Sequence, residues 1–246
     1  MVDVNPAGQQ PLARRLFAEA VGTGLLVTVV VGSGIAAASL SPGNVGLQLL
    51  ENSTATAFGL GVLVLLFGPV SGAHFNPLVS VADWLLGRGA GTGLNGRDVA
   101  AYTGAQVVGG IAGAVLANAM YSLAPVQVSG RERVSGGVLL GEVVATAGLI
   151  ALIFALARTG RAPLSAAAVG AYIGSAYWFT SSTSFANPAV TIGRVFSDTF
   201  AGIAPASVVP FIAAQVLGAA LGAGLVRVLY PDVAGIAGDV VVSQHR

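Results

Sequence analysis

Long apolar stretches separated by short polar segments dominate the 246-residue chain. Six of them are long enough to cross a bilayer as helices, and they fall at about residues 14–38, 53–70, 99–121, 137–157, 164–182 and 206–230. Two more apolar segments, 77–86 and 188–196, have room for only about two or three helical turns. The pattern therefore predicts an all-α membrane protein with six transmembrane helices and two re-entrant half-helices.

Both short segments begin with the dipeptide Asn-Pro, at Asn76-Pro77 and at Asn187-Pro188. This dipeptide is a helix-start signature, because Asn caps free backbone N–H groups and Pro at the first helical position has no N–H to leave unpaired. Irregular backbone at membrane depth is tolerated only where protein buries it or where it lines a polar cavity. Two such segments therefore predict an internal pathway.

The Asn side chains indicate what this pathway admits. If each side-chain oxygen caps its own half-helix, the NH2 groups of Asn76 and Asn187 stay free to donate into the lumen. Two helix N-termini, each equivalent to about half a positive charge, converge at the same place. Such a site attracts a solute oxygen and repels a cation, so the motif pair predicts selectivity for small uncharged solutes.

The two halves of the chain repeat one another when residues 12–121 are laid beside residues 137–230. Each half has a Glu in its first span, an Asn-Pro after its second and a Gln among small residues in its third. The matching pairs are Glu19 and Glu142, Asn76 and Asn187, and Gln106 and Gln215. Since each half has three spans, the second half must enter the membrane upside down. We therefore expect one domain, residues 1–246, built as an inverted 3+3 repeat.

Composition agrees with a membrane protein and excludes several other classes. Hydrophobic residues make up 54% of the chain and charged residues 9%, which leaves too few ionisable groups to cover a soluble globule. A net charge of +1, with basic residues scattered singly, argues against a nucleic-acid partner. Cysteine is absent, which excludes disulfides, thiolate metal sites and a Cys nucleophile. No motif predicts a metal or a cofactor.

The arginines predict the orientation in the membrane, because cytoplasmic loops carry the excess of basic residues. With the N-terminus inside, the arginines on the cytoplasmic side are Arg14, Arg15, Arg88, Arg97, Arg158, Arg161, Arg227 and Arg246. Arg131, Arg133 and Arg194 are then left outside, and both termini are predicted to be cytoplasmic. The first stretch follows two arginines, as a signal peptide would, but its length and Glu19 within it favour a spanning helix.

Two loops carry a family resemblance. The sequences SGAHFNPLVS at 71–80 and SFANPAVTIGR at 184–194 resemble the signature loops of the major intrinsic protein family, the aquaporins and glycerol facilitators. The resemblance covers nearly the whole chain and implies six tilted helices plus two half-helices around each pore, in a homotetramer with one pore per subunit. It places Asn76-Pro77-Leu78 and Asn187-Pro188-Ala189 at the pore midplane.

Three ionisable residues in apolar surroundings allow more than one interpretation. Intramembrane acids such as Glu19 and Glu142 are candidates for proton relays. In the family that this chain resembles, the matching acids brace the re-entrant loops by accepting from backbone N–H groups, and we favour that role. His74 is a candidate metal ligand or pH sensor. With no second His or Cys beside it, we interpret His74 as a loop brace or a pore-lining contact.

The chain departs from the family pattern at both motifs. Leu78 stands where the family usually has Ala, which puts a bulkier residue where the half-helices meet. Val190 stands where the family usually has an Arg that donates to solute oxygens at the outer constriction. Arg194, about one helical turn farther out, is not expected to replace it and is spaced to pair with Asp198. The constriction is therefore predicted to be wider, less polar and less repulsive to cations.

Family spacing places three more residues at this constriction, namely Ser184, Ser175 and the aromatic Phe58. Phe58 depends on the alignment of a segment that is shorter than usual. Thr183 takes the place of Ser184 if the loop is shifted by one residue. A lining of small hydroxyl groups without an Arg suits polyols.

Val190 and the stretch AYWFTSSTSFANPAVTIGRVFSDTFAGIAP make the chain similar to a bacterial group of the family found beside arsenic-resistance genes, so a bacterial inner membrane is expected. Arsenite at neutral pH is the uncharged As(OH)3, a polyol mimic similar in size to glycerol. Water, glycerol and arsenite are therefore all expected solutes, and a strict water channel is the main alternative. A secondary transporter also uses inverted repeats, but both half-helices here open on Asn rather than on an ionisable residue. No nucleophile or metal-ligand motif predicts an enzyme.

Overall fold

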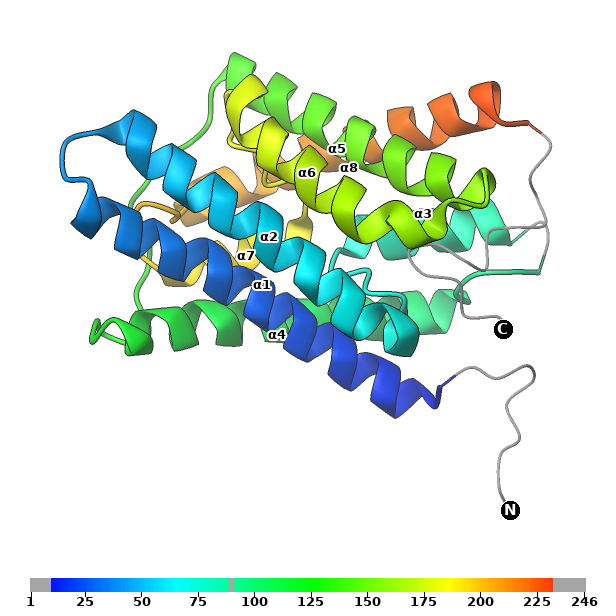
Figure 1. Cartoon of the computed structure of the whole chain (residues 1–246), viewed down its shortest axis with the longest axis horizontal. Helices are drawn as coiled ribbons and strands as arrows, with labels where there is room; N and C mark the ends of the chain where they lie inside the picture. Colours follow the sequence, from blue (N-terminus) through cyan, green and yellow to red (C-terminus); the bar gives the residue numbers. More distant parts are fainter. Residues whose placement is uncertain (1–9, 89–90, 232–246) are drawn as a thin grey trace.

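The computed structural model describes residues 10–88 and 91–231, and within them the chain forms helices joined by loops (Figure 1). The longer helices are α1 Leu12–Leu40, α2 Val45–Ser71, α4 Gly96–Met120, α5 Gly136–Arg158, α6 Ser165–Phe179 and α8 Pro205–Leu229. The shorter ones are α3 Pro77–Gly87, α7 Pro188–Gly193 and the 3-10 turns η2 Ala162–Leu164 and η3 Arg194–Phe196. These ranges contain no β-strand, and the predicted all-α class is confirmed. Arg246, used above for the orientation, lies outside the described residues.

The spanning helices follow the predicted apolar stretches, with two differences in length. α1, α2, α4, α5 and α8 are each long and apolar enough to cross a membrane. α6 has 15 residues and is preceded directly by η2, so the predicted 164–182 span contains a shorter helix. α2 begins at Val45, well before the predicted residue 53. The prediction began too late because Glu51 and Asn52 interrupt the apolar pattern. Both find partners in the bundle, since Glu51 accepts from Ser41 Oγ and Asn52 donates to the carbonyl of Val30.

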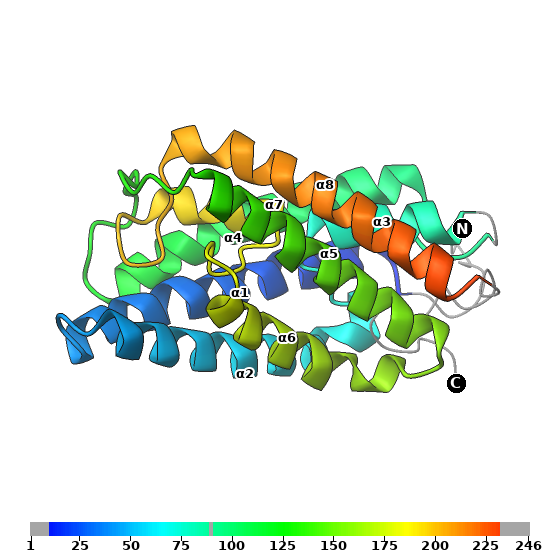
Figure 2. The same ribbon diagram turned by 90° about the horizontal axis from the view of Figure 1, so that it is seen from above.

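Small residues bring the helices of each half close together. α1 packs against α4, and α5 packs against α8 (Figures 1 and 2). A Cβ atom added to Gly109 in α4 would lie 2.0 Å from the carbonyl oxygen of Ala20 in α1. One added to Gly222 in α8 would lie 2.4 Å from the carbonyl oxygen of Ala147 in α5. Larger side chains at these positions would push the helices apart. The same close contact, which depends on a glycine, therefore occurs once in each half of the chain.

The two half-helices begin where the sequence predicts. Each starts at the Pro of its Asn-Pro motif and is capped by the preceding Asn. The Asn76 side-chain oxygen accepts from Leu78 N (3.0 Å), and the Asn187 oxygen accepts from Ala189 N (2.9 Å). α7 has only six residues, and η3 continues it along the predicted segment. α3 and α7 contact one another and extend into opposite halves of the elongated bundle (Figure 2).

Candidate functional site

The two Asn side chains join the re-entrant loops to one another. Asn76 Nδ2 donates to the carbonyl oxygen of Ala186 (2.8 Å), and Asn187 Nδ2 donates to that of Phe75 (2.6 Å). Each acceptor belongs to the residue just before the other Asn. The prediction that both NH2 groups are wholly free is therefore wrong for one hydrogen of each, because the opposing loop lies within its reach. The second hydrogen of each amide remains for a solute.

Glu19, in α1, supports the first re-entrant loop. Its carboxylate accepts from the backbone N–H groups of His74 (3.0 Å) and Phe75 (2.7 Å), and from Ser71 Oγ and Gln106 Nε2. Glu19 is fully buried, and these donors compensate the hydration that the carboxylate has lost. The contacts are those expected of a residue that braces the loop.

Glu142, in α5, supports the second loop in the same way. It accepts from the backbone N–H groups of Phe185 (2.9 Å) and Ala186 (2.9 Å) and from Gln215 Nε2 (2.6 Å). Gln215 also donates to Thr191 Oγ1 in α7, as Gln106 donates to Ser80 Oγ in α3. Each half therefore joins a Glu, a Gln and a hydroxyl group into one network behind its loop.

The backbone of both loops adopts a conformation that L side chains rarely take. Four non-glycine residues at matching places have positive φ angles: Ala73 (49°), Phe75 (49°), Ser184 (50°) and Ala186 (47°). Such strain persists only where the surroundings enforce it, and it is concentrated at functional sites. The last two N–H groups before each Asn point to a carboxylate, Glu19 in the first loop and Glu142 in the second, while Ala73 N and Ser184 N donate to the hydroxyls of Ser71 and Ser182. In the described part of the chain the carbonyl oxygens of His74 and Phe185 accept no protein hydrogen bond, so they remain available as acceptors.

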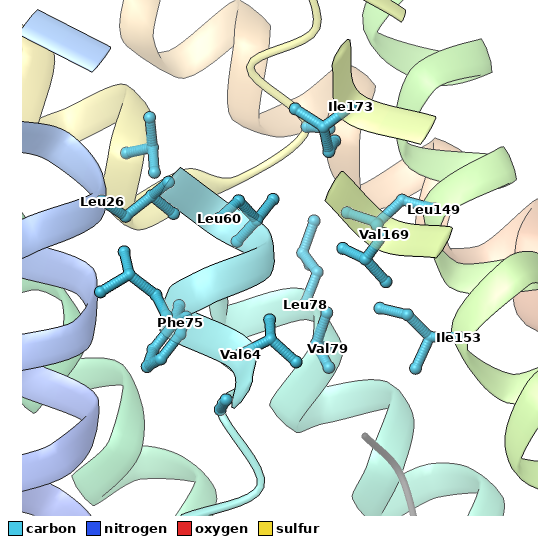
Figure 3. Close-up of a cluster of buried hydrophobic side chains, with 14 of the residues drawn as sticks. Leu26, Leu60, Val64, Phe75, Leu78, Val79, Leu149, Ile153, Val169 and Ile173 are labelled. Atoms are coloured by element: carbon cyan, nitrogen blue, oxygen red, sulfur yellow. The ribbon is translucent and has the colours of Figure 1, made fainter. Parts of the chain in front are cut away.

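A cavity lies between these loops and the surrounding helices. Figure 3 shows apolar side chains from α1, α2, α3, α5 and α6 converging there. The polar groups come mainly from the two re-entrant loops and from the end of the cavity near Arg194. The lining residues are Leu26, Val30, Thr56, Leu60, Val64, Ala73, His74, Phe75, Asn76, Val79, Leu149, Ile153, Val169, Ile173, Tyr177, Ser184, Phe185, Ala186, Asn187, Val190 and Arg194. The cavity thus combines a largely apolar wall with a few convergent polar groups, which is the usual character of a small-solute site.

Several predicted residues lie on or beside this cavity. Val190 and Ser184 line it, whereas Thr183, the alternative to Ser184, does not. Ser184 Oγ is buried and has no hydrogen-bond partner in the described chain. His74 also lines the cavity, with Nδ1 3.0 Å from Ser80 Oγ. The remaining motif residues, Pro77, Leu78, Pro188 and Ala189, are buried in the half-helices.

Two of the predicted constriction residues lie elsewhere. Phe58 is 74% exposed on the outer face of α2, and Ser175 is exposed on α6. Neither lines the cavity, so both assignments are wrong. Residues two positions apart on a helix point to roughly opposite sides, and the cavity is lined instead by Thr56 on α2 and by Ile173 and Tyr177 on α6. The signal that finds these positions is the four-residue spacing of lining residues on each helix.

Arg194 also differs from its prediction. It is 2% exposed and lines the cavity, whereas it was expected one turn farther out than Val190 and without a part in the constriction. Its Nε donates to the carbonyl oxygen of Ala201 (2.5 Å), and its guanidinium carbon lies 3.4 Å from the ring centroid of Phe185. The expected ion pair with Asp198 does not form, because that carboxylate accepts from Gly130 N. The loop after η3 folds back, so that the carbonyl oxygen of Ala201, and not the Asp198 carboxylate, accepts from Arg194.

Two further arginines hold the same loop. Arg131 Nη1 donates to the carbonyl oxygen of Phe200 (2.6 Å), while Arg133 donates to that carbonyl and, through Nε, to the carbonyl of Gly202 (2.7 Å). Burial, together with the charges of Arg194 and Arg131, lowers the pKa of Arg133 to about 9, so it remains charged at neutral pH. The end of the cavity near Arg194 therefore has a cluster of positive charge.

The described residues contain no group of three or more His, Asp and Glu side chains that could hold a metal ion. Arg15 in α1 and Asp98 in α4 form an ion pair (2.8 Å), and Arg15 lies over the ring of Tyr102. This pair lies outside the cavity lining. The groups that line the cavity therefore offer hydrogen bonding and positive charge.

Comparisons with known proteins agree on one family. The family model described as "Major intrinsic protein" matches residues 7–183 and 165–245. The aquaglyceroporin AqpS of Rhizobium meliloti is 49% identical over 216 residues, covering 88% of this chain and 90% of its own. The glycerol uptake facilitator protein of Pseudomonas aeruginosa is 34% identical, covering 87% of each chain. Among solved structures, the aquaglyceroporin from Plasmodium falciparum shares the fold with a TM-score of 0.63 at 18% identity, covering 93% of this chain and 99% of its own.

Proposed function

Because the chain belongs to the major intrinsic protein family, the aquaporins and aquaglyceroporins, we propose that it is a passive channel for water, glycerol-like polyols and arsenite. The family consists of membrane channels rather than enzymes. The observation that carries the proposal is the pair Asn76 and Asn187, which meet on a largely apolar cavity. A neutral solute that sheds water there regains hydrogen bonds from the free amide hydrogens and the loop carbonyls. An ion finds too few groups to replace its hydration shell.

The residues around Val190 support a pathway wide enough for polyols. Val190 is smaller than the Arg usual at this position, and Ile173 lines the cavity with it. Ser184 adds an unpartnered hydroxyl group on the same wall. An apolar wall with one hydroxyl accommodates both the C–H face and the O–H groups of a polyol. A strict water channel would need a narrower, more polar constriction at this level.

Arsenite is the third proposed solute. As(OH)3 is uncharged at neutral pH and presents three hydroxyl groups on a compact core, so groups that suit glycerol also suit it. The proposal is supported by the absence of an Arg side chain at position 190 and by the place of Ser184 on the cavity wall. The chain has no cysteine, so no protein thiol would trap the arsenic during passage.

The proposed assembly is a homotetramer in a bacterial inner membrane, with one pore per subunit and both termini in the cytoplasm. Within the domain of residues 1–246, residues 12–121 and 137–230 form the two inverted repeats. The matched networks behind the two loops support this repeat. Cross-linking of the protein in native membranes tests the tetramer, and reporter fusions at each terminus test the orientation.

Flux measurements test the proposed function. Proteoliposomes containing the chain are expected to shrink faster than protein-free liposomes under a sucrose gradient, because water leaves through the pore. They are expected to reswell under a glycerol gradient, and flux should not change with proton or sodium gradients. Accumulation against a solute gradient would indicate a secondary transporter, and water flux without glycerol flux would indicate a strict water channel. Arsenite uptake at the empty-vector level would exclude arsenite alone.

A further inference from the structure

Arg194 has contacts that its sequence spacing does not predict. It follows Val190 by four residues, about one helical turn, and lies at the outer end of the same cavity wall. Its Nε is bound to the carbonyl oxygen of Ala201, and its guanidinium stacks on the ring of Phe185. These two contacts fix the guanidinium plane and its direction.

The terminal nitrogens of Arg194 remain free. Neither Nη1 nor Nη2 has a hydrogen-bond partner in the ranges that the structure describes, and neither is sealed away from the cavity. No acidic side chain is paired with it there either. A buried guanidinium with free donors on a cavity wall is a ligand for a passing oxygen atom and a fixed positive charge.

The two neighbouring arginines differ from Arg194 in this respect. Arg131 and Arg133 direct their donors to the loop carbonyls of Phe200 and Gly202, and neither of them lines the cavity. Their hydrogen bonds hold the loop at this end of the cavity. Arg194 is therefore the arginine at this end whose donors face the pathway.

We propose that Arg194 is the cation-excluding residue and solute donor of the outer filter, acting one helical turn outward from Val190. The proposal rests on the channel function proposed above. It separates two properties that a single Arg at the position of Val190 would combine. Val190 sets the width of the pathway, while Arg194 sets its charge at a level farther out. The filter thus admits neutral solutes larger than water and still opposes cations, in contrast to the weak cation barrier predicted from Val190 alone.

Charge substitutions at Arg194 test the proposal in proteoliposomes containing the full chain. Potassium flux, measured with a potential-sensitive dye, is recorded beside water and glycerol flux for the parent, Arg194→Gln and Arg194→Lys. Arg194→Gln is expected to raise potassium flux by about tenfold or more, because it removes the fixed positive charge that opposes entry of the cation. A tenfold change in flux requires only a small change in the free-energy barrier to permeation. Arg194→Lys is expected to stay near the parent because it keeps the charge. Arg131→Gln removes one charge from the same end outside the cavity and is the matched control, with potassium flux unchanged.

Each outcome decides between the roles. If the parent conducts neutral solutes but Arg194→Gln matches it in potassium flux, the filter proposal is overturned while the channel function stands. If Gln and Lys both raise potassium flux equally, or both lose water flux together with thermal stability, Arg194 is only a structural support for the loop. If the parent conducts no neutral solute above protein-free liposomes, the channel function itself has failed.

The cysteine-free chain allows a second, independent measurement. Arg194→Cys introduces the sole thiol, so any effect of a thiol reagent arises at residue 194. A membrane-impermeant cationic methanethiosulfonate added outside is expected to react and to return potassium flux toward the parent value, whereas an anionic reagent is not. Absence of labelling in a variant that conducts water would place residue 194 outside the pathway and overturn the proposal.

Discussion

Asn187 Nδ2 lies 2.6 Å from the carbonyl oxygen of Phe75, so the cap of one half-helix is bonded directly to the loop that leads into the other. The reciprocal bond joins Asn76 Nδ2 to the carbonyl oxygen of Ala186. Each Asn therefore has two roles, since its oxygen caps its own helix while its nitrogen joins the loops. Asn is suited to this position because a single short side chain supplies both an acceptor and a two-hydrogen donor.

Asn187→Asp separates these roles. Asp keeps an oxygen that caps α7 but replaces the donor to Phe75 with an acceptor, so two oxygens would face one another. We expect a loss of stability of roughly 1–3 kcal/mol and a fall in water flux, with more cation leak because a carboxylate stands at the midplane. Thermal unfolding in detergent and liposome flux measure the two effects.

Asn118→Asp is the matched control for this change. Asn118 is also buried and donates to the carbonyl oxygens of Pro125 and Phe196, away from the cavity. It is expected to lose comparable stability without added cation leak in the folded fraction. Equal leak in both variants would contradict a midplane role for Asn187.

Glu142→Gln tests the support of the second loop. The carboxylate accepts two backbone N–H groups and Gln215 Nε2, and an amide would keep one acceptor and set an NH2 group against the remaining donors. We expect a loss of roughly 1–3 kcal/mol in unfolding free energy. Solute flux per folded channel should stay independent of the proton gradient. Glu132→Gln, at an exposed loop position, should leave stability unchanged. Proton-coupled flux in the parent that disappears in Glu142→Gln would instead indicate a relay.

Some of the site could be predicted because its signals are local or repeated. The Asn-Pro pairs mark both half-helices, and the recurrence of Glu and Gln in each half identifies the network behind the loops. The start of α2 was placed too late because Glu51 and Asn52 resemble loop residues until their partners in neighbouring elements are known. A pattern along one segment does not show such partners.

The outer filter was harder to predict, for two physical reasons. Phe58 and Ser175 were placed by alignment, and on a helix an error of two positions turns a side chain to the opposite face. Arg194 depends on a fold-back of the chain, since the segment tightens to a 3-10 turn there and the following loop brings the Ala201 carbonyl to its Nε. Neither the tightening nor that non-local acceptor is encoded in the spacing from Val190.

Gly109→Ala tests the close approach of α1 and α4. The added methyl group would lie 2.0 Å from the Ala20 carbonyl oxygen, so the helices must move apart. Overpacking of this kind costs about 1–3 kcal/mol. Gly104→Ala on the same helix is the control, because nothing lies within 4 Å of its Cβ position, and Ala there favours the helix. Thermal unfolding should place Gly109→Ala below the parent and Gly104→Ala at or above it. The reverse order would contradict the packing.

Val190→Arg tests the division of the outer filter between width and charge. Val190 is 5% exposed on the cavity wall, and an Arg there adds a long charged side chain one turn inward from Arg194. We expect glycerol and arsenite flux to fall much more than water flux, because the larger solutes lose the space. Cation exclusion should change little while Arg194 remains. In the double variant Val190→Arg with Arg194→Gln, cation exclusion should persist, since the new Arg supplies the charge. A solute panel measured on all three proteins separates these effects, and an unchanged panel in Val190→Arg would remove Val190 from the constriction.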